Sequence, residues 1–472
     1  MRQCRHDSRP PERMTPGPAP QDPAFDAVII GGGAAGALVA IRLLMRDGPA
    51  PRIAIVEPDA LLARGAAYST DGPEHLLNVV ASRMSAIAEE PDHFVRFLTH
   101  DRPEADAATL ADAFAPRRDY GRYLRHTLDS LPARDALVHL RDRAVDVERN
   151  DDGHNVHLAS GARLRAAHVV LAIGNAPRPL PGHLRHEGMR LAEAWDYDAV
   201  RGIAPDADVC ILGSGLSMVD AALSLAQAGH RGRIRVLSRH GLMPLPHTRT
   251  GSQHGDGVAD LLPLGVRARW RRLRQRIDEV VAAGEPWQWS FDRLRHHGEA
   301  LWRSLDDGER RRFLRHAVRY WDIHRHRIAP QVAAMLERLQ ASGQLDVIAG
   351  RLRSITAAPE GGSCVHHRPR HGARDHMLHA DWIINATGVE TNIDLRPGEL
   401  LQALRERGLI IPGPQGIGIA TTGIGHAIDR RGRPDPRLMA LGAMRIGDLW
   451  ESIAIPELRV QARQIAGFIL GE

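Results

Sequence analysis

The feature that most constrains this chain is a glycine-rich turn between a short apolar run and a helical pattern. Residues 28–30 are apolar and β-branched and predict a buried strand, and apolar residues at helical spacing follow from Leu38 onward. Between them, Gly31, Gly33 and Gly36 form a Gly-x-Gly-x-x-Gly pattern. In such a turn the first glycine allows the tight bend, the second lets a pyrophosphate approach the backbone, and the third lets the helix pack on the strand. The free N–H groups that begin the helix attract phosphate.

An acidic residue, Glu57, occupies the sequence position at which dinucleotide-binding turns have a carboxylate for the ribose hydroxyls. A second apolar strand is predicted at residues 52–56, and Glu57 follows it, 21 residues after Gly36. A separation of about 20 residues brings a carboxylate to the ribose hydroxyls of a dinucleotide bound on the turn. An ordinary strand–turn–helix unit would leave Glu57 unexplained. The pattern therefore predicts a dinucleotide site formed by the three glycines and Glu57.

The same logic recurs in the middle of the chain. Gly213 and Gly215 keep the first two glycine positions, and Met218 occupies the third. The strand predicted at residues 233–238 is followed by Arg239 instead of an acid. An arginine at this place suits the 2′-phosphate of NADP, although Arg239 could also be a solvated charge. We therefore expect a second dinucleotide site that takes NADPH in preference to NADH.

The order of these patterns predicts an α/β protein with two Rossmann-like dinucleotide-binding domains and a mostly helical insertion in the second. We expect a disordered tail at residues 1–22. The first domain takes residues 23–190 and is completed by residues 381–472. The second takes residues 191–380 and carries the insertion at about 241–343.

The insertion gathers tryptophans among many arginines and histidines. Helices are expected in it at residues 266–281 and 309–320. Plain helix packing, a cap over a substrate pocket, and nucleic-acid binding by stacking are all compatible with this composition. The tryptophans are Trp270, Trp287, Trp289, Trp302 and Trp321.

Composition excludes several classes of function. The 472 residues contain no lysine, which excludes Schiff-base chemistry and the Walker-A phosphate loop. Cys4, Cys210 and Cys364 are scattered without a Cys-x-x-Cys spacing, so neither a zinc site nor thiol–disulfide chemistry is expected. The arginines are spread along the chain among acids, so nucleic acid is not an expected partner. No apolar run approaches the ~18 residues of a membrane span and no signal peptide is visible, so we expect a cytoplasmic protein without a membrane partner.

Further motifs resemble a bacterial FAD/NAD(P)-binding protein family among the flavoproteins with two dinucleotide-binding domains. Its relatives include flavin-dependent N-hydroxylases and Baeyer–Villiger monooxygenases. The resemblance covers nearly everything after the tail. The motifs that carry it are Gly-Ala-Ala-Tyr-Ser at 65–69, His-Leu-Leu-Asn-Val at 75–79, the glycine turn at 213–220, Asn-Ala-Thr-Gly at 385–388 and the segment 449–459.

The resemblance implies FAD in the first domain and NADPH in the second. It places Gly442 and Asp448 near the ribityl or phosphate part of FAD, and Gly388 near the cofactors at the end of a strand. The loop that begins at Asn78 would pass the flavin ring, although loop packing explains it equally well. The residues implied to hold FAD are Gly31, Gly33, Gly36 and Glu57, and those implied to hold NADPH are Gly213, Gly215 and Arg239.

The implied activity is that of an NADPH-dependent flavoprotein oxidoreductase, most readily a monooxygenase that uses molecular oxygen on a small molecule. A flavin reductase or dehydrogenase without oxygen activation and a non-catalytic flavin-binding redox protein stay open as alternatives. The Baeyer–Villiger fingerprint is not present, so ester-forming oxygenation is not expected. No catalytic residue and no metal ligands are predicted, and the sequence leaves the substrate and the formation of a homodimer open.

Overall fold

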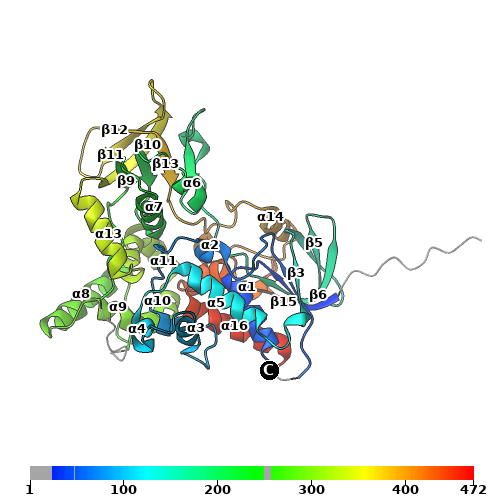
Figure 1. Ribbon diagram of the computed structural model, residues 1–472. Coiled ribbons are helices and arrows are strands. Elements are labelled where there is room, and N and C mark those ends of the chain that lie inside the picture. Colours follow the sequence, from blue (N-terminus) through cyan, green and yellow to red (C-terminus); the bar gives the residue numbers. More distant parts are fainter. Residues whose placement is uncertain (1–23, 47, 249–256) are drawn as a thin grey trace, which may run out of the picture.

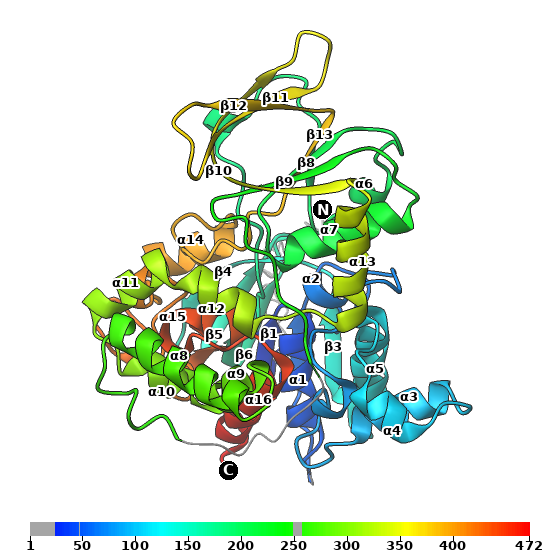
Figure 2. The same cartoon turned by 90° about the vertical axis from the view of Figure 1, so that its left-hand side faces the viewer.

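The computed structural model describes residues 24–46, 48–248 and 257–472. The predicted tail at residues 1–22 lies outside these ranges. Two sheets form two lobes, and the chain builds most of the first sheet, crosses to build the second, and returns to complete the first (Figures 1 and 2). The predicted α/β class with two Rossmann-like domains is confirmed.

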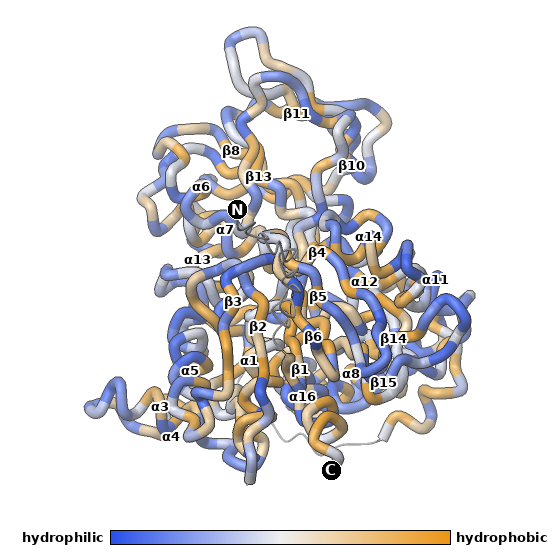
Figure 3. The backbone as a smooth tube through the Cα atoms, turned by 90° about the vertical axis from the view of Figure 1, so that its right-hand side faces the viewer, coloured by the Kyte–Doolittle hydropathy of each residue, from blue (hydrophilic) through white to orange (hydrophobic). Residues whose placement is uncertain are grey.

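The first sheet has eight strands, and its central part is parallel, in the order β15–β6–β1–β2–β3. Its middle strands are apolar on both faces because helices and loops cover both sides. Figure 3 shows the hydrophobic residues of these strands at the centre of the lobe. Antiparallel strands β14, β4 and β5 extend it. The strands are β1 (Ala24–Ile30), β2 (Ile53–Val56), β3 (Leu137–Leu140), β4 (Ala144–Arg149), β5 (His154–Leu158), β6 (Arg163–Leu171), β14 (His426–Ile428) and β15 (Pro434–Ala440).

Helix α1 (Ala34–Leu44) lies on one face of this sheet between α5 (Arg117–Asp129) and α16 (Ile455–Leu470). Two shorter helices, α3 (His93–Asp101) and α4 (Ala107–Asp112), pack beside α5 (Figure 1). On the other face, α14 (Glu399–Glu406) packs against β4 and contributes to a second apolar core.

The second sheet has seven strands in the order β12–β11–β10–β9–β8–β13–β7, parallel from β10 to β7. Helices α6 (Tyr197–Arg201), α7 (Leu216–Gln227) and α13 (Pro330–Ala341) accompany it, and α7 and α13 cover one face. The strands are β7 (Leu191–Glu193), β8 (Val209–Leu212), β9 (Ile234–Ser238), β10 (Leu345–Ala357), β11 (Ser363–Pro369), β12 (His376–Ala380) and β13 (Trp382–Asn385).

One expected break in this sheet is absent. The sequence pattern suggests separate strands at residues 345–348 and 352–355, whereas β10 runs through both. Its first half pairs with β9 and its second half with β11, and a register shift lies between Leu352 and Ser354. The bulge changes the side-chain alternation without ending the strand, so the pattern reads as two pieces.

The helical insertion packs against the C-terminal part of the first lobe (Figure 2). Arg295 pairs with Glu457 at 3.1 Å and Arg325 with Glu451 at 2.7 Å. No helix among the described residues is both long and apolar enough to cross a membrane. The helices of the insertion are α8 (Val266–Ala282), α9 (Gln288–Leu294), α10 (Gly298–Arg303), α11 (Asp307–His316) and α12 (Val318–Arg325).

The expected helix at residues 266–281 is confirmed as α8, whereas a continuous helix over 309–320 is wrong. α11 ends at His316 and α12 begins at Val318, with the buried Ala317 between them at a φ of −115°. Phe313 on α11 and Trp321 on α12 pack with their ring centroids 6.3 Å apart.

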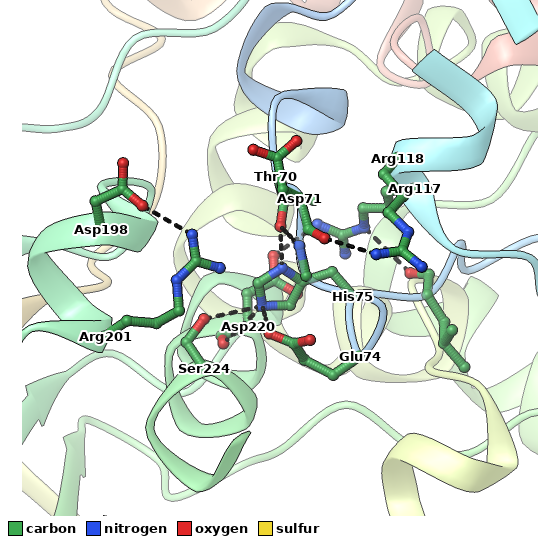
Figure 4. Close-up of polar contacts among 12 residues, drawn as sticks. Thr70, Asp71, Glu74, His75, Arg117, Arg118, Asp198, Arg201, Asp220 and Ser224 are labelled. Atoms are coloured by element: carbon green, nitrogen blue, oxygen red, sulfur yellow. Dashed lines mark hydrogen bonds and ion pairs between the residues drawn. The ribbon is translucent and has the colours of Figure 1, made fainter. Parts of the chain in front are cut away.

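A buried polar network joins the two lobes (Figure 4). His75 belongs to the first lobe, and its Nε2 lies 3.0 Å from Ser224 Oγ and 3.2 Å from the carbonyl oxygen of Asp220, both on α7. Its Nδ1 lies 2.5 Å from Thr70 Oγ1. Arg117 on α5 donates to the Asp220 carboxylate at 2.6 Å.

The partners of His75 fix its tautomer. A carbonyl oxygen can only accept a hydrogen bond, so Nε2 carries the hydrogen toward Asp220 and Nδ1 accepts one from the Thr70 hydroxyl. Burial lowers the pKa of the His75 imidazole, while Asp220 and Glu74 oppose this effect. The neutral ring is therefore the form that joins the lobes.

Replacing His75 should change both stability and its pH dependence. His75→Gln should lower the free energy of unfolding by about 1–3 kcal/mol at pH 7.5, because buried partners lose hydrogen bonds. Because the folded-state pKa lies below the ordinary 6.5, the contribution of His75 is fully present above pH 6.5 and is lost as the pH falls below that value. Thermal unfolding from pH 8 to pH 5 should therefore show a smaller loss of stability in the variant than in the parent chain.

His183→Gln is the control, because His183 is exposed. It should leave the pH profile of unfolding unchanged. Identical profiles for the parent chain and His75→Gln would contradict the neutral, buried role of His75.

Candidate dinucleotide-binding sites

The first glycine turn lies at the carboxyl end of β1 and leads directly into α1. Gly31 has a φ of +105°, and a Cβ placed there would come within 2.4 Å of the Ala172 carbonyl oxygen. A Cβ on Gly36 would come within 2.0 Å of the Gly31 carbonyl oxygen, so this glycine sets how closely helix and turn pack. Both positions therefore require glycine, for the reasons expected from the sequence.

The N-terminus of α1 is open to a ligand. Gly33 is its N-cap, no side chain caps the helix, and its first turn contains no acidic residue. The Cα of Gly65, at the start of α2 (Gly65–Tyr68), lies 3.4 Å from the position of a Cβ on Gly33. The uncapped N–H groups and the helix dipole form an anion site that two glycine backbones border.

Glu57 is anchored at the edge of this turn. One carboxylate oxygen accepts from the N–H of Gly32 at 2.8 Å, and the other accepts from the N–H of Asp59 at 3.1 Å. Each carboxylate oxygen can accept more than one hydrogen bond, so both retain capacity for ribose hydroxyls. The structure thus brings Gly31, Gly33, Gly36 and Glu57 together.

The C-terminal segment supplies a second group of predicted residues. Gly442 has a φ of +66°, and its N–H donates to Gln461 Oε1 at 3.0 Å. Asp448, on α15 (Ile446–Leu449), accepts from the N–H and the hydroxyl of Thr421 at 2.9 and 2.6 Å. Burial raises the pKa of the Asp448 carboxyl, and Thr421 offsets part of this rise. One oxygen of Asp448 is thus already engaged within the protein.

The second glycine turn repeats the first. Gly213 has a φ of +108°, and a Cβ there would come within 2.2 Å of the Ala386 carbonyl oxygen. Gly215 is the N-cap of α7, which also has no side-chain cap, and a Cβ there would meet no atom within 4 Å. Met218, at the third glycine position, is fully buried in the core beneath α7. The departure at Met218 is accommodated by packing and leaves the N-terminus of α7 open.

Arginines gather where the second site would place a 2′-phosphate. Arg239 directly follows β9, and burial and the nearby guanidinium groups lower its pKa. Among the described residues, neither Arg239 nor Arg351 on β10 has an acidic partner within ion-pair distance. Such a concentration of positive charge fits an added anion better than a solvated surface charge. The guanidinium groups near Arg239 belong to Arg319, Arg351 and Arg178.

Two predicted residues lie between the lobes. Gly388, with a φ of +103°, is on the segment that returns to the first lobe, and its carbonyl accepts from the N–H of Arg178 at 2.9 Å. The carbonyl of Asn78 accepts from His247 Nε2 at 2.9 Å, and Asn78 also lines a small cavity beside Arg117. Contact of Gly388 or Asn78 with a cofactor stays a prediction.

The sequence patterns did not single out several residues of these sites. Gly65 borders the first turn, and Thr421 holds Asp448. Arg351 and Arg319 approach Arg239 from β10 and α12. Gly65 had a usable signal, because it begins a quoted motif of small residues, whereas the others are brought in by strands and helices distant in sequence.

The geometry of both sites fits dinucleotides. Each has a glycine at positive φ and an uncapped helix N-terminus that attracts phosphate. Each also has a charged side chain after the second strand that can distinguish free ribose hydroxyls from a 2′-phosphate. The first offers the Glu57 carboxylate to free hydroxyls, and the second offers arginines to a phosphate.

Comparison with known proteins agrees with this arrangement. Residues 28–176 match the model of a family described as FAD-NAD(P)-binding. None of the curated protein sequences compared with the chain matches it significantly.

Solved structures match over nearly the whole chain. The ornithine N-hydroxylase of Kutzneria sp. 744 has 15% sequence identity and a TM-score of 0.67, with 95% of this chain and 99% of that chain covered. The L-lysine 6-monooxygenase of Pseudomonas syringae has 15% identity and a TM-score of 0.65, with the same coverage of 95% and 99%. A bacillithiol disulfide reductase of Staphylococcus aureus has 14% identity, the same coverage of 95% and 99%, and a TM-score of 0.55.

At these identities the structural matches establish the fold. The family match over residues 28–176 includes the first glycine turn and Glu57, and it agrees with a dinucleotide-binding site in that part of the chain.

Proposed function

We propose that this protein is an NADPH-dependent FAD monooxygenase that acts on a small molecule. The observation that carries the proposal is that the glycine turn occurs twice, with a side chain of opposite charge at the place where each site would bind a ribose. Glu57 stands at the first turn, and an arginine cluster stands at the second. A carboxylate repels the 2′-phosphate of NADPH, whereas arginines bind it, so the two turns sort FAD and NADPH between the lobes.

The residues around the first turn bind and orient. The N-terminus of α1 would hold the pyrophosphate of FAD and Glu57 its ribose, and Asp448, which is fixed by Thr421, would bind near the ribityl chain. The His75 network holds the second lobe against the first. When bound, FAD would supply the redox chemistry by which reducing equivalents from NADPH and one atom of O₂ reach the substrate, with the other atom released as water.

Two of the similar structures support oxygen transfer, because one is an ornithine N-hydroxylase and the other an L-lysine 6-monooxygenase. The disulfide reductase of the same fold suggests a different chemistry, but the described thiols do not favour it. Burial raises the pKa of Cys210 to about 12, which suppresses the nucleophilic thiolate, and Cys364 lies on β11 without a cysteine partner among the described residues. A reductase without oxygen activation remains the second candidate.

Reduction and reoxidation, followed separately, test the proposal. The purified protein should contain FAD, and NADPH should bleach it anaerobically faster than NADH does. On an oxygen pulse, a monooxygenase should return to oxidised flavin through a distinct second absorbance phase, whereas a reductase should reoxidise in one phase with release of peroxide. Protein that cannot be loaded with FAD would refute the proposal.

Two matched aspartate substitutions should separate the two sites. Aspartate is a favourable N-cap, and both Gly33 and Gly215 are N-caps with extended backbone, so Gly33→Asp and Gly215→Asp should fold. The added charge should repel phosphate and weaken binding about a hundredfold, or about 2.7 kcal/mol. Flavin content and NADPH binding, measured by fluorescence titration, should show that Gly33→Asp loses FAD and that Gly215→Asp keeps FAD but loses NADPH.

Each variant is the control for the other, and circular dichroism checks the fold. Loss of FAD in Gly215→Asp, or retention of FAD in Gly33→Asp, would contradict the assignment of FAD to the first turn and NADPH to the second.

Arg239 should decide between the two nicotinamide cofactors. Arg239→Gln should weaken NADPH binding about tenfold and leave NADH binding nearly unchanged, because only NADPH carries the 2′-phosphate. The measurement is the dissociation constant for each cofactor from the rate of anaerobic flavin reduction.

Arg231→Gln is the matched control, because Arg231 lies before β9, whereas Arg239 follows β9. Arg231 also pairs with Asp206 at 2.7 Å. Equal effects of Arg231→Gln and Arg239→Gln on NADPH would contradict a specific phosphate contact.

A further inference from the structure

The helical insertion encloses an apolar space. The cavity volume is about 70 Å³. Close-packed protein interiors contain few voids larger than a water molecule, which needs only ~10–15 Å³, so this space is larger than most packing defects. Its walls come chiefly from α8 and α10, with single residues from α9, α11 and α12 and Trp450 of the C-terminal segment. The large side chains among them are Trp270, Trp302, Trp321, Trp450 and Phe313.

The charged group in these walls is already satisfied. The Arg269 guanidinium donates to the carbonyls of Leu264 and Leu262 at 2.7 and 2.8 Å and to Ser304 Oγ at 2.8 Å. The N–H donors of Arg269 are therefore engaged by the protein's own neutral oxygens. The residues that line the space include no carboxylate, so they offer no counter-charge to an ammonium group.

One polar group in the walls has no partner. Trp321 is nine-tenths buried, and its indole Nε1 makes no hydrogen bond to any described residue. This nitrogen has almost no accessible surface, so it lies against other protein atoms and does not face the open space. Trp302 Nε1 donates to the Gly447 carbonyl at 2.7 Å. Neither of these two indole N–H groups therefore offers a polar contact to a ligand in this space.

The cavity borders the segment predicted to hold FAD. Trp450 lies two residues after Asp448, and its backbone has a φ of +63° and a ψ of −60°, a strained conformation for a bulky residue. Its ring stacks on Trp302 with centroids 4.7 Å apart and meets Phe313 edge-on at 5.1 Å. These contacts hold Trp450 in its strained conformation, as part of both the cavity wall and the segment of Asp448.

We infer that this cavity receives the apolar part of the substrate, an uncharged aromatic or aliphatic group. The identification of the bound molecule as the substrate rests on the proposed function. It separates this protein from the relatives whose names specify ornithine and lysine, because a charged amino-acid side chain would find no counter-charge here.

The test uses 4-fluoroacetophenone, an apolar ring with one carbonyl, on the full chain loaded with FAD. Its dissociation constant is measured by fluorine NMR, while the flavin absorption spectrum and the rate of NADPH oxidation are followed. We expect saturable binding that changes the spectrum or the rate, and no displacement by L-ornithine.

Matched variants locate the binding. Val266→Phe fills the cavity and should weaken binding at least tenfold, whereas Val281→Phe adds the same ring to an exposed position on the same helix and should not. Leu301→Phe serves as a second filling variant if Val266→Phe does not fold.

Three outcomes would overturn the inference. They are absence of saturable binding, equal binding to Val266→Phe and Val281→Phe, and binding that alters neither the flavin spectrum nor NADPH oxidation. Failure of the proposed function would be distinguishable, since it would appear as loss of FAD or of reduction by NADPH in the same preparations while 4-fluoroacetophenone still binds.

Discussion

The carbonyl oxygen of Ala172 lies too close to Gly31 to leave room for a Cβ there. The carbonyl oxygen of Ala386 lies similarly close to Gly213. In each lobe the chain at the end of a neighbouring parallel strand presses against the turn that precedes the helix. Only a residue without a side chain can take the positive φ and tolerate this contact. The two helix N-termini are consequently exposed at the strand ends, uncapped and able to attract phosphate.

What differs between the lobes is the side chain that follows the second strand. Glu57 is fixed by backbone N–H groups of its own turn, so its carboxylate is oriented before any ligand arrives. Arg239 has no such local anchor and stands among guanidinium groups from other elements. The two turns therefore share one backbone geometry, and they differ in the charge of the side chain that follows the second strand.

The relative placement of the lobes depends on contacts that neither turn contains. The neutral His75 ring meets Ser224 and Asp220 on the helix that the second turn begins. The insertion ties the second lobe to the C-terminal segment through the pairs Arg325–Glu451 and Arg295–Glu457. Because Trp450 belongs to that segment, the apolar cavity of the insertion and the predicted FAD segment share one wall.

The sequence by itself determined the local machinery: strand, glycine turn, helix and acid at the first site, and the repeat with Arg239 at the second. These follow from spacing and from backbone rules that act within about thirty residues. Only the tertiary structure decided that Arg351 and Arg319 approach Arg239, that His75 reaches Ser224, and that the insertion breaks at Ala317 and encloses an apolar space with Trp450. Side chains from distant segments meet through packing of whole elements, and periodicity within one segment contains no information about which side chains those will be.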